Sequence, residues 1–449
     1  MRRSVYFHID EVARDAVVAA NLRRVLDPFG VRLVYGNRAN SEVIRYFKTL
    51  PAFDLCIFPS MDLFRVSCPQ PDRISIPVIL LPAETVGGTS RNLDRVAAKY
   101  FGSYPGDCVD WLEKITAFCL WGPSHYRVFE TMRPHLVDKC HVVGHPRFDY
   151  RCQRPASLAV PSEKIRIGII SRFPGLNPFD GRGTIQIIFD GRRIRGDEPI
   201  YRLSPDRDIE DRIYVESIDL RTLFQIVDRL DRTRHEVILR AHPREDRTVW
   251  ERLIARNKLP IKIAPWDQPF MHWVKSVDYV LGPVSTSFFD SIVGGKVPVC
   301  TIDLAPHRQS HILAGGDDEN RILNYVLRPK SVDEVIDLVS SKPPGELPEL
   351  SGGVLHILHE ETNYPDCFNS LDRLARVCLD VLDSARSVRT TSSARLRHEL
   401  FAAGHAIATR IWHLGNPEQS SSFVLNRRRK QWIDALAWEG SAPIGNIRS

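Results

Sequence analysis

A histidine–proline pair stands at the end of one predicted strand, where it could bind a phosphate. The strand runs from Val237 to Ala241 and includes Arg240, and His242 and Pro243 follow it directly. Ligands of open α/β sheets bind outside the carboxyl ends of strands, and proline keeps the residue before it out of the helical region. His242 can donate to a phosphate oxygen, and Arg240 can add a charged pair of donors. An ordinary turn with a surface histidine is the alternative.

Three hydroxyl residues between a later strand and a helix suit the same ligand. They are Ser285, Thr286 and Ser287. Hydroxyl side chains cap free backbone amides at helix starts, and those amides favour a phosphate. Capping alone explains one such residue better than three together. Asp290, one turn further, could accept hydrogen bonds from ribose hydroxyls, or its charge could simply cap the start of the helix.

A carboxylate in the amino-terminal half is a candidate general base. The strand Val78 to Leu81 leads into a loop that carries Glu84 and, after it, two glycines. A carboxylate at this place can accept a proton from an acceptor hydroxyl, and partial burial would raise its pKa. A solvated loop glutamate is the alternative. Asp10 and Glu11, after the first strand, form a weaker cluster that helix capping also explains.

A glycine- and proline-bearing corner closes the first half of the chain. His145 and Arg147 lie within it and could face a cleft, although a structural corner is the stronger interpretation. Asp206-Arg207-Asp208 is the one Asp-x-Asp match, and because it lies in an insert and does not follow a core strand, we interpret it as a chance match.

The elements that must position these residues alternate between strand and helix. Short β-branched runs precede amphipathic stretches, which is typical of a parallel sheet covered by helices. The predicted strands cover 4–9, 31–35, 55–58, 78–81, 117–120, 141–143, 165–170, 237–241, 261–264, 279–281 and 297–301, and the clearest helices cover 10–26, 220–230, 248–256 and 287–293. The sequence therefore predicts an α/β protein with two doubly wound, Rossmann-like domains.

A polar, proline-bearing stretch between the two halves indicates the domain boundary. We expect a first domain over 1–158 and a second over 159–345, with an insert at 171–217 that contains a hairpin turning at Asp190-Gly191. Residues 346–449 are expected to form a helical appendage. It ends in a tail with the basic run 427–430, which is either solvated or in contact with anionic lipid.

Composition narrows the function classes. The chain has 449 residues, 43% of them hydrophobic and 26% charged, which is typical of a folded protein with a packed core. No apolar run is long enough to span a bilayer, and no signal peptide fits. Nine scattered cysteines indicate reduced thiols, so we expect a cytoplasmic protein, at most peripheral at the inner membrane face. A net charge of +6 without a basic-aromatic module argues against nucleic acid as a partner.

At these motifs the chain resembles the bacterial surface carbohydrate biosynthesis family. This family is related to capsule Kdo transferases, bacterial sialyltransferases and CDP-glycerol glycerophosphotransferases. The resemblance runs from about Ser4 to Ser340. It rests on the His242-Pro243 element, the Ser285 to Ser287 turn and a corner in which His145 replaces an asparagine. The family's acidic segment is represented by Glu84 alone.

The resemblance implies a GT-B arrangement, with the nucleotide held by the second domain and the acceptor by the first. It implies a glycosyltransferase that needs no cofactor or metal. The donor would be a nucleotide-activated sugar, with a CMP-linked one favoured, and the acceptor a glycan or a lipid-linked molecule. Glu84 and His242 would then line opposite walls of the site. A CDP-alcohol phosphotransferase, a sugar-nucleotide epimerase and a non-catalytic glycan-assembly protein are the alternatives.

Overall fold

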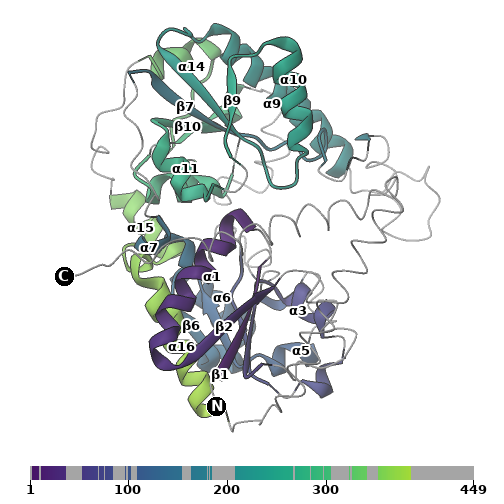
Figure 1. Cartoon of the computed structure of the whole chain (residues 1–449), viewed down its shortest axis with the longest axis vertical. Coiled ribbons are helices and arrows are strands. Elements are labelled where there is room, and N and C mark those ends of the chain that lie inside the picture. The colour runs from purple at the N-terminus through teal and green to yellow at the C-terminus, as the bar shows by residue number, and fades with distance from the viewer. Residues whose placement is uncertain are drawn as a thin grey trace. The chain divides into compact units, whose positions relative to one another are not determined.

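The computed structural model describes two compact units, and the sequence continues between and beyond the described segments. The structure describes residues 3–9, 12–36, 53–83, 109–153, 163–178, 208–265, 268–304, 326–340 and 352–385, except 69, 75, 284 and 297. It also describes residues 97, 100–102, 181, 183–184 and 323. The first unit comprises Met1–Arg154 with Leu358–Ser449, and the second comprises Pro155–Ile357. Figure 1 shows both units, with many of their helices and strands labelled.

The first unit is built on a parallel sheet of six strands in the order β2-β1-β3-β4-β5-β6. Its elements are β1 (Arg3–His8), α1 (Val12–Leu26), β2 (Val31–Gly36), β3 (Leu55–Phe58), α3 (Met61–Ser67), β4 (Val78–Leu80), α5 (Val109–Lys114), β5 (Ala117–Leu120), α6 (Pro123–Met132), β6 (Cys140–Val142), the short helix η6 (Pro146–Phe148) and α7 (Tyr150–Gln153). Alternate residues of the strands enter two apolar clusters, one on each face. Helices α3, α5 and α6 contribute to one cluster and α1 to the other, so the sheet is covered on both faces.

The second unit repeats this plan with five parallel strands in the order β11-β10-β7-β8-β9. Its elements are β7 (Ile165–Ile170), α9 (Asp208–Arg229), β8 (His235–Arg240), α10 (Arg247–Asn257), β9 (Ile261–Ile263), α11 (Phe270–Ser276), β10 (Tyr279–Gly282), α12 (Ser287–Val293), β11 (Pro298–Cys300) and α14 (Val332–Leu338). Helices α9, α10 and α14 pack on one face and α11 on the other. The predicted pair of doubly wound Rossmann-like domains is therefore confirmed.

Helix α9 is longer than the sequence predicted. It begins at Asp208, so the last ten residues of the expected insert 171–217 are helical, whereas we placed the helix start near Leu220. The buried face of α9 carries the polar residues Glu216 and Asp219 beside Val215. These polar positions interrupt the apolar period by which a helix is recognised in a sequence. The expected hairpin with its turn at Asp190-Gly191 lies outside the described residues.

Helix α16 (Ser370–Ser384), which we expected in an appendage after residue 345, packs into the core of the first unit. Its apolar stripe includes Leu371, Leu374, Cys378 and Val381, all buried against α1 and the first sheet. Figure 1 shows α16 beside α1. Helix α15 (Gly352–Thr362) precedes it. An apolar stripe at helical spacing must be buried somewhere, and here it packs on the face of the first sheet that α1 also covers.

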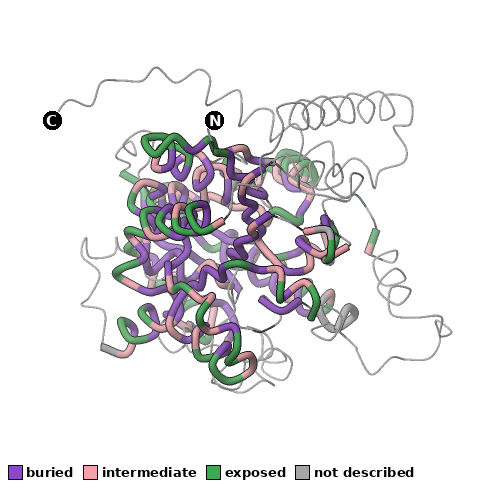
Figure 2. The backbone as a smooth tube through the Cα atoms, turned by 90° about the horizontal axis from the view of Figure 1, so that it is seen from below, coloured by how far each residue is buried: buried purple, intermediate pink, exposed green. Residues whose placement is uncertain are grey.

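Burial follows the layers of each sheet. Figure 2 shows buried residues in the interior and exposed residues along the outer helical turns. Among the described residues, no helix is both long and apolar enough to cross a membrane.

Candidate functional site

The predicted phosphate-binding residues lie at the carboxyl edge of the second sheet. The chain runs from β7 to β8 and β9 on one side and then returns to β10 on the other side of β7. Ligands of open α/β sheets bind outside the strand ends at such a reversal. Neighbouring strands are about 4.8 Å apart, so the loops after β8 and β10 begin about 10 Å from each other. One ligand that carries phosphate groups can therefore touch both loops.

His242 lies in the loop after β8, with its backbone and ring held by the loops around it. Its backbone N–H donates to Ser171 Oγ at 2.9 Å, and its Nδ1 accepts from the backbone N–H of Arg244 at 3.1 Å. Because Nδ1 is an acceptor, the neutral ring carries its proton on Nε2. His242 is half-buried, and Pro243 and Arg244 are exposed. The ring can therefore present an Nε2–H donor to an anion.

Arg240 is the last residue of β8 and is partly exposed. Its Nη1 donates to the carbonyl oxygen of Pro265 at 2.8 Å, in the loop after β9. This bond anchors the guanidinium beside the His242 loop, and its predicted contact with a phosphate stays a prediction.

The turn after β10 contains one hydroxyl that acts as a cap. Ser285 Oγ accepts from the backbone N–H of Ser287 at 3.1 Å. All three hydroxyl residues, including Thr286, are half-buried, so they are within reach of solvent. Asp290 is only 3% exposed and lies beneath that surface. The turn therefore offers hydroxyl groups to a ligand, whereas the depth of Asp290 is at odds with a direct contact to ribose.

A buried carboxylate that the sequence analysis did not single out holds the loops after β7 and β8 together. Glu245 is 4% exposed and accepts from Ser171 Oγ at 2.7 Å, from the backbone N–H of Phe173 at 2.6 Å and from Trp250 Nε1 at 2.7 Å. Burial is the main cause that raises the pKa of this carboxyl, the three hydrogen bonds lower it and the neighbouring Glu216 raises it, and the net pKa is about 7. In the sequence Glu245 is one of several polar residues at a helix start, and nothing in that pattern marks it as buried.

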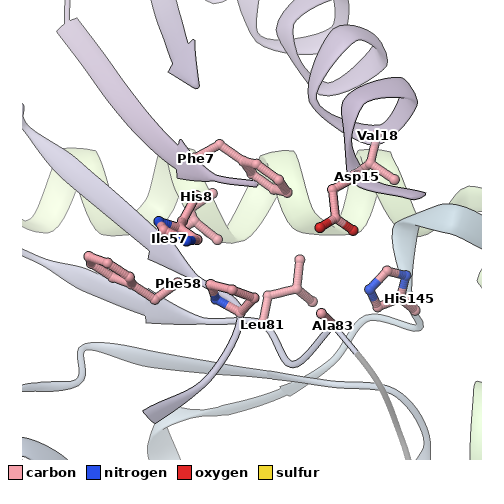
Figure 3. A pocket seen from close by; sticks show the side chains of 10 residues that line it. Phe7, His8, Asp15, Val18, Ile57, Phe58, Leu81, Ala83 and His145 are labelled. Atoms are coloured by element: carbon pink, nitrogen blue, oxygen red, sulfur yellow. The ribbon is translucent and has the colours of Figure 1, made fainter. Parts of the chain in front are cut away.

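The first unit has a small cavity at the carboxyl edge of its own sheet. His8, Asp15 and His145 are the polar residues around it, and Figure 3 shows them among apolar side chains from the ends of β1, β3 and β4. Its free space of about 10 Å³ holds about one water molecule. Asp15 is buried and forms an ion pair with Arg14 at 2.7 Å. The candidate base Glu84 and the weaker candidates Asp10 and Glu11 lie outside the described residues.

The corner with His145 and Arg147 is part of the core of the first unit. Both side chains are buried, and the Arg147 guanidinium lies over the Trp121 ring at 4.5 Å. His145 Nδ1 accepts from the backbone N–H of Arg147 at 3.1 Å, the same local arrangement as at His242. Burial lowers the pKa of His145 well below its usual value, and the charges of Arg147 and Arg14 add to this. The ring is therefore neutral.

The rest of the corner ties α16 to the first unit. Asp149 is fully buried and accepts from the backbone N–H of Leu371 at 2.9 Å and from the Arg151 side chain at 2.8 Å. Gly144 has φ +77°, and a Cβ there would lie 3.0 Å from Cys367. These contacts give the corner a structural role.

Metal ligands were not expected, and the described residues contain no cluster of three His, Cys, Asp or Glu side chains that could hold a metal ion. Of the Asp-x-Asp match, Asp208 begins α9 and the two residues before it are not described.

Comparison with known proteins places the fold. No family model matches the sequence, and no curated protein matches it significantly. Among solved structures, the H548A variant of the wall teichoic acid polymerase TagF has a TM-score of 0.51 at 8% identity, over 86% of this chain and 90% of that one. Two others are less similar. S. aureus MnaA in its UDP co-structure has a TM-score of 0.46 at 10% identity, over 86% and 99% of the two chains. The UDP-GlcNAc 2-epimerase of Methanocaldococcus jannaschii has 0.43 at 11%, over 85% and 100%.

The chain thus has the fold of the GT-B class, with two Rossmann-like domains. At 8% identity, the likeness to TagF shows the fold alone.

Proposed function

We propose that the protein is a glycosyltransferase of cell-surface glycan synthesis. It would transfer a sugar from a nucleotide-activated donor, with a CMP-linked donor favoured, to a glycan or lipid-linked acceptor. The second domain would bind the nucleotide, and the first domain would bind the acceptor. The proposal requires no metal and no cofactor.

The observation that carries the proposal is the pair of loops at the strand reversal of the second sheet. The loop after β8 offers the Nε2–H of His242, and the loop after β10 offers the hydroxyl groups of Ser285 to Ser287. In a sugar transfer, negative charge develops on the departing phosphate. Donors that are already fixed in place stabilise this charge without having to reorganise. Arg240, held beside the same loop, would add positive charge.

The acceptor hydroxyl must lose a proton during the transfer, and we assign Glu84 as its base. The assignment rests on the place of Glu84 after the strand that forms β4. His145 and Arg147, the weaker cleft candidates of the first domain, are buried in the corner and are given no role in this step.

A second candidate is transfer of an alcohol phosphate from a CDP-alcohol. TagF, whose fold the chain shares, is a wall teichoic acid polymerase. The same phosphate-binding loops would serve this reaction. Product analysis separates the possibilities, because a glycosyltransferase releases the nucleotide from a sugar and a phosphotransferase releases it from an alcohol phosphate. An epimerase would convert its donor without an acceptor, and a non-catalytic relative would bind the nucleotide without turnover.

Thermal shift with CMP, CDP, UDP and GDP tests the proposal first. A ligand at 100 times its Kd stabilises the folded state by about 2.7 kcal/mol, which corresponds to a rise in Tm of about 5–10 °C for a domain of this size. We expect such a rise for a cytidine nucleotide, and a rise at most about half as large in His242→Ala. The absence of a shift with all four nucleotides would refute nucleotide binding, and with it the proposed function.

A further inference from the structure

The backbone of the His242 loop is connected to a buried carboxylate through one hydroxyl. Ser171, the first residue after β7, is fully buried. Its Oγ accepts from the backbone N–H of His242 at 2.9 Å and donates to Glu245 Oε2 at 2.7 Å. Ser171 therefore connects the end of β7, the central strand of the sheet, to the loop that carries His242.

Glu245 extends this connection to further residues in the described part of the loop after β7. Its other oxygen accepts from the backbone N–H of Phe173 at 2.6 Å, and Asn177 Nδ2 donates to the carbonyl oxygen of Asp246 at 2.9 Å. The loops after β7 and β8 are thus joined at Ser171, Phe173 and Asn177. Several short hydrogen bonds would have to break before these two loops could separate.

A second buried carboxylate fixes the outer part of the same loop. Glu216, on α9, accepts from the backbone N–H groups of Gly175 at 2.7 Å and Leu176 at 3.1 Å. A Cβ at position 175 would lie 2.9 Å from Glu216 Oε2, so glycine permits this approach. The backbone amides of Phe173, Gly175 and Leu176 are therefore occupied by protein carboxylates, and a ligand at this edge must find its donors elsewhere.

We propose that Ser171 and Glu245 are positioning residues for His242. The Ser171 hydroxyl, itself held by the Glu245 carboxylate, fixes where the histidine backbone lies, and thereby where its Nε2–H points. Neither residue has to touch the ligand. The inference deepens the proposed function, on which the role of His242 as a phosphate donor rests.

Three variants separate positioning from simple stabilisation. Ser171→Ala removes the acceptor of the His242 N–H and leaves Glu245 with Phe173 and Trp250. Trp250→Phe is the matched control, because it removes a donor to the same carboxylate and leaves the Ser171 bonds to His242 and Glu245 in place. Glu245→Gln is a second perturbation, since an amide cannot accept from all three donors in either orientation.

Two readouts are measured on the full chain. The first is the affinity for the nucleotide that stabilises the wild type, by titration calorimetry. The second is the ring ¹H–¹³C NMR signal of His242, identified by its loss in His242→Ala. We expect Ser171→Ala to lower nucleotide affinity about tenfold and to shift or broaden the His242 signal. Glu245→Gln should do the same to a smaller extent, while Trp250→Phe lowers Tm and leaves both readouts unchanged.

Equal effects of Ser171→Ala and Trp250→Phe on both readouts would overturn the positioning role, because the changes would then follow stability alone. A wild-type affinity and His242 signal in Ser171→Ala would overturn it as well. If the wild type binds none of the four nucleotides but the His242 signal responds to Ser171→Ala and not to Trp250→Phe, the positioning role stands and the proposed function fails.

Discussion

Replacement of His242 tests most sharply whether its side chain binds a phosphate or only shapes the turn after β8. In His242→Ala the ring is lost, while the backbone N–H can still donate to Ser171 Oγ. His242 lies in a loop and is half-buried, so the free energy of unfolding should change by less than about 1 kcal/mol. One hydrogen bond to a charged group contributes about 1.5–3 kcal/mol, which corresponds to a ten- to hundredfold loss of nucleotide affinity.

His242→Asn is the matched control for this prediction. An asparagine oxygen can replace Nδ1 as the acceptor of the Arg244 N–H at 3.1 Å, since asparagine caps a turn in this way. It has no group at the position of Nε2. We therefore expect His242→Asn to keep the turn and to lose as much affinity as His242→Ala.

Titration calorimetry with the stabilising nucleotide, and chemical denaturation of each variant, measure the two effects separately. Wild-type affinity in His242→Asn would show that the histidine only shapes the turn, and the reasoning from the Nε2–H donor would be wrong. Unchanged affinity in His242→Ala would also refute the phosphate role.

Four further outcomes are expected. Glu84→Gln should lower turnover by about 10²–10⁴-fold and leave nucleotide affinity unchanged in a product assay; a loss of affinity with normal turnover would contradict its assignment as the base. His145→Ala should lower the free energy of unfolding by about 2–4 kcal/mol in urea, because its buried ring is 4.5 Å from that of Trp121, and a wild-type midpoint would exclude a core role. Asp149→Ala should cost about 3 kcal/mol, because the buried Leu371 N–H loses its acceptor and Arg151 keeps only its ion pair with Asp372, against less than about 1 kcal/mol for the half-exposed Asp372 in Asp372→Ala. The pKa of Glu245, raised from 4.5 to about 7, means that the folded state holds this proton more tightly than the unfolded state, so the contribution to stability falls as pH rises from about 4.5 to about 7. Between pH 5 and pH 8 the wild type should lose about 2 kcal/mol relative to Glu245→Gln, and a constant difference would contradict the raised pKa.

The order of the elements could be predicted from the sequence because each strand and helix has its own apolar pattern. Strands 55–58, 117–120 and 165–170 have the predicted bounds in the structure. A buried parallel strand is a short apolar run, and such a run is visible without knowledge of its neighbours. The start of α9 was predicted wrongly because Glu216 and Asp219 lie on its buried face.

The surface on which α16 packs depends on tertiary structure. Its apolar stripe predicts that one face is buried, but no local signal states which sheet accepts it. Contacts such as the Leu371 N–H with Asp149, 222 positions apart in the chain, decide this.

Two histidine–proline–arginine runs show most directly which features the local sequence determines and which it does not. In both, the histidine Nδ1 accepts from the arginine N–H at 3.1 Å, since proline fixes the turn, and the local sequence determines this arrangement. His145 is buried beneath Trp121 and α16, whereas His242 stays half-buried at the strand reversal of the second sheet. Only the packing of distant segments determines burial, and burial decides which ring can meet a ligand. The sequence by itself determined the two turns, and the tertiary structure determined which of them is available for chemistry.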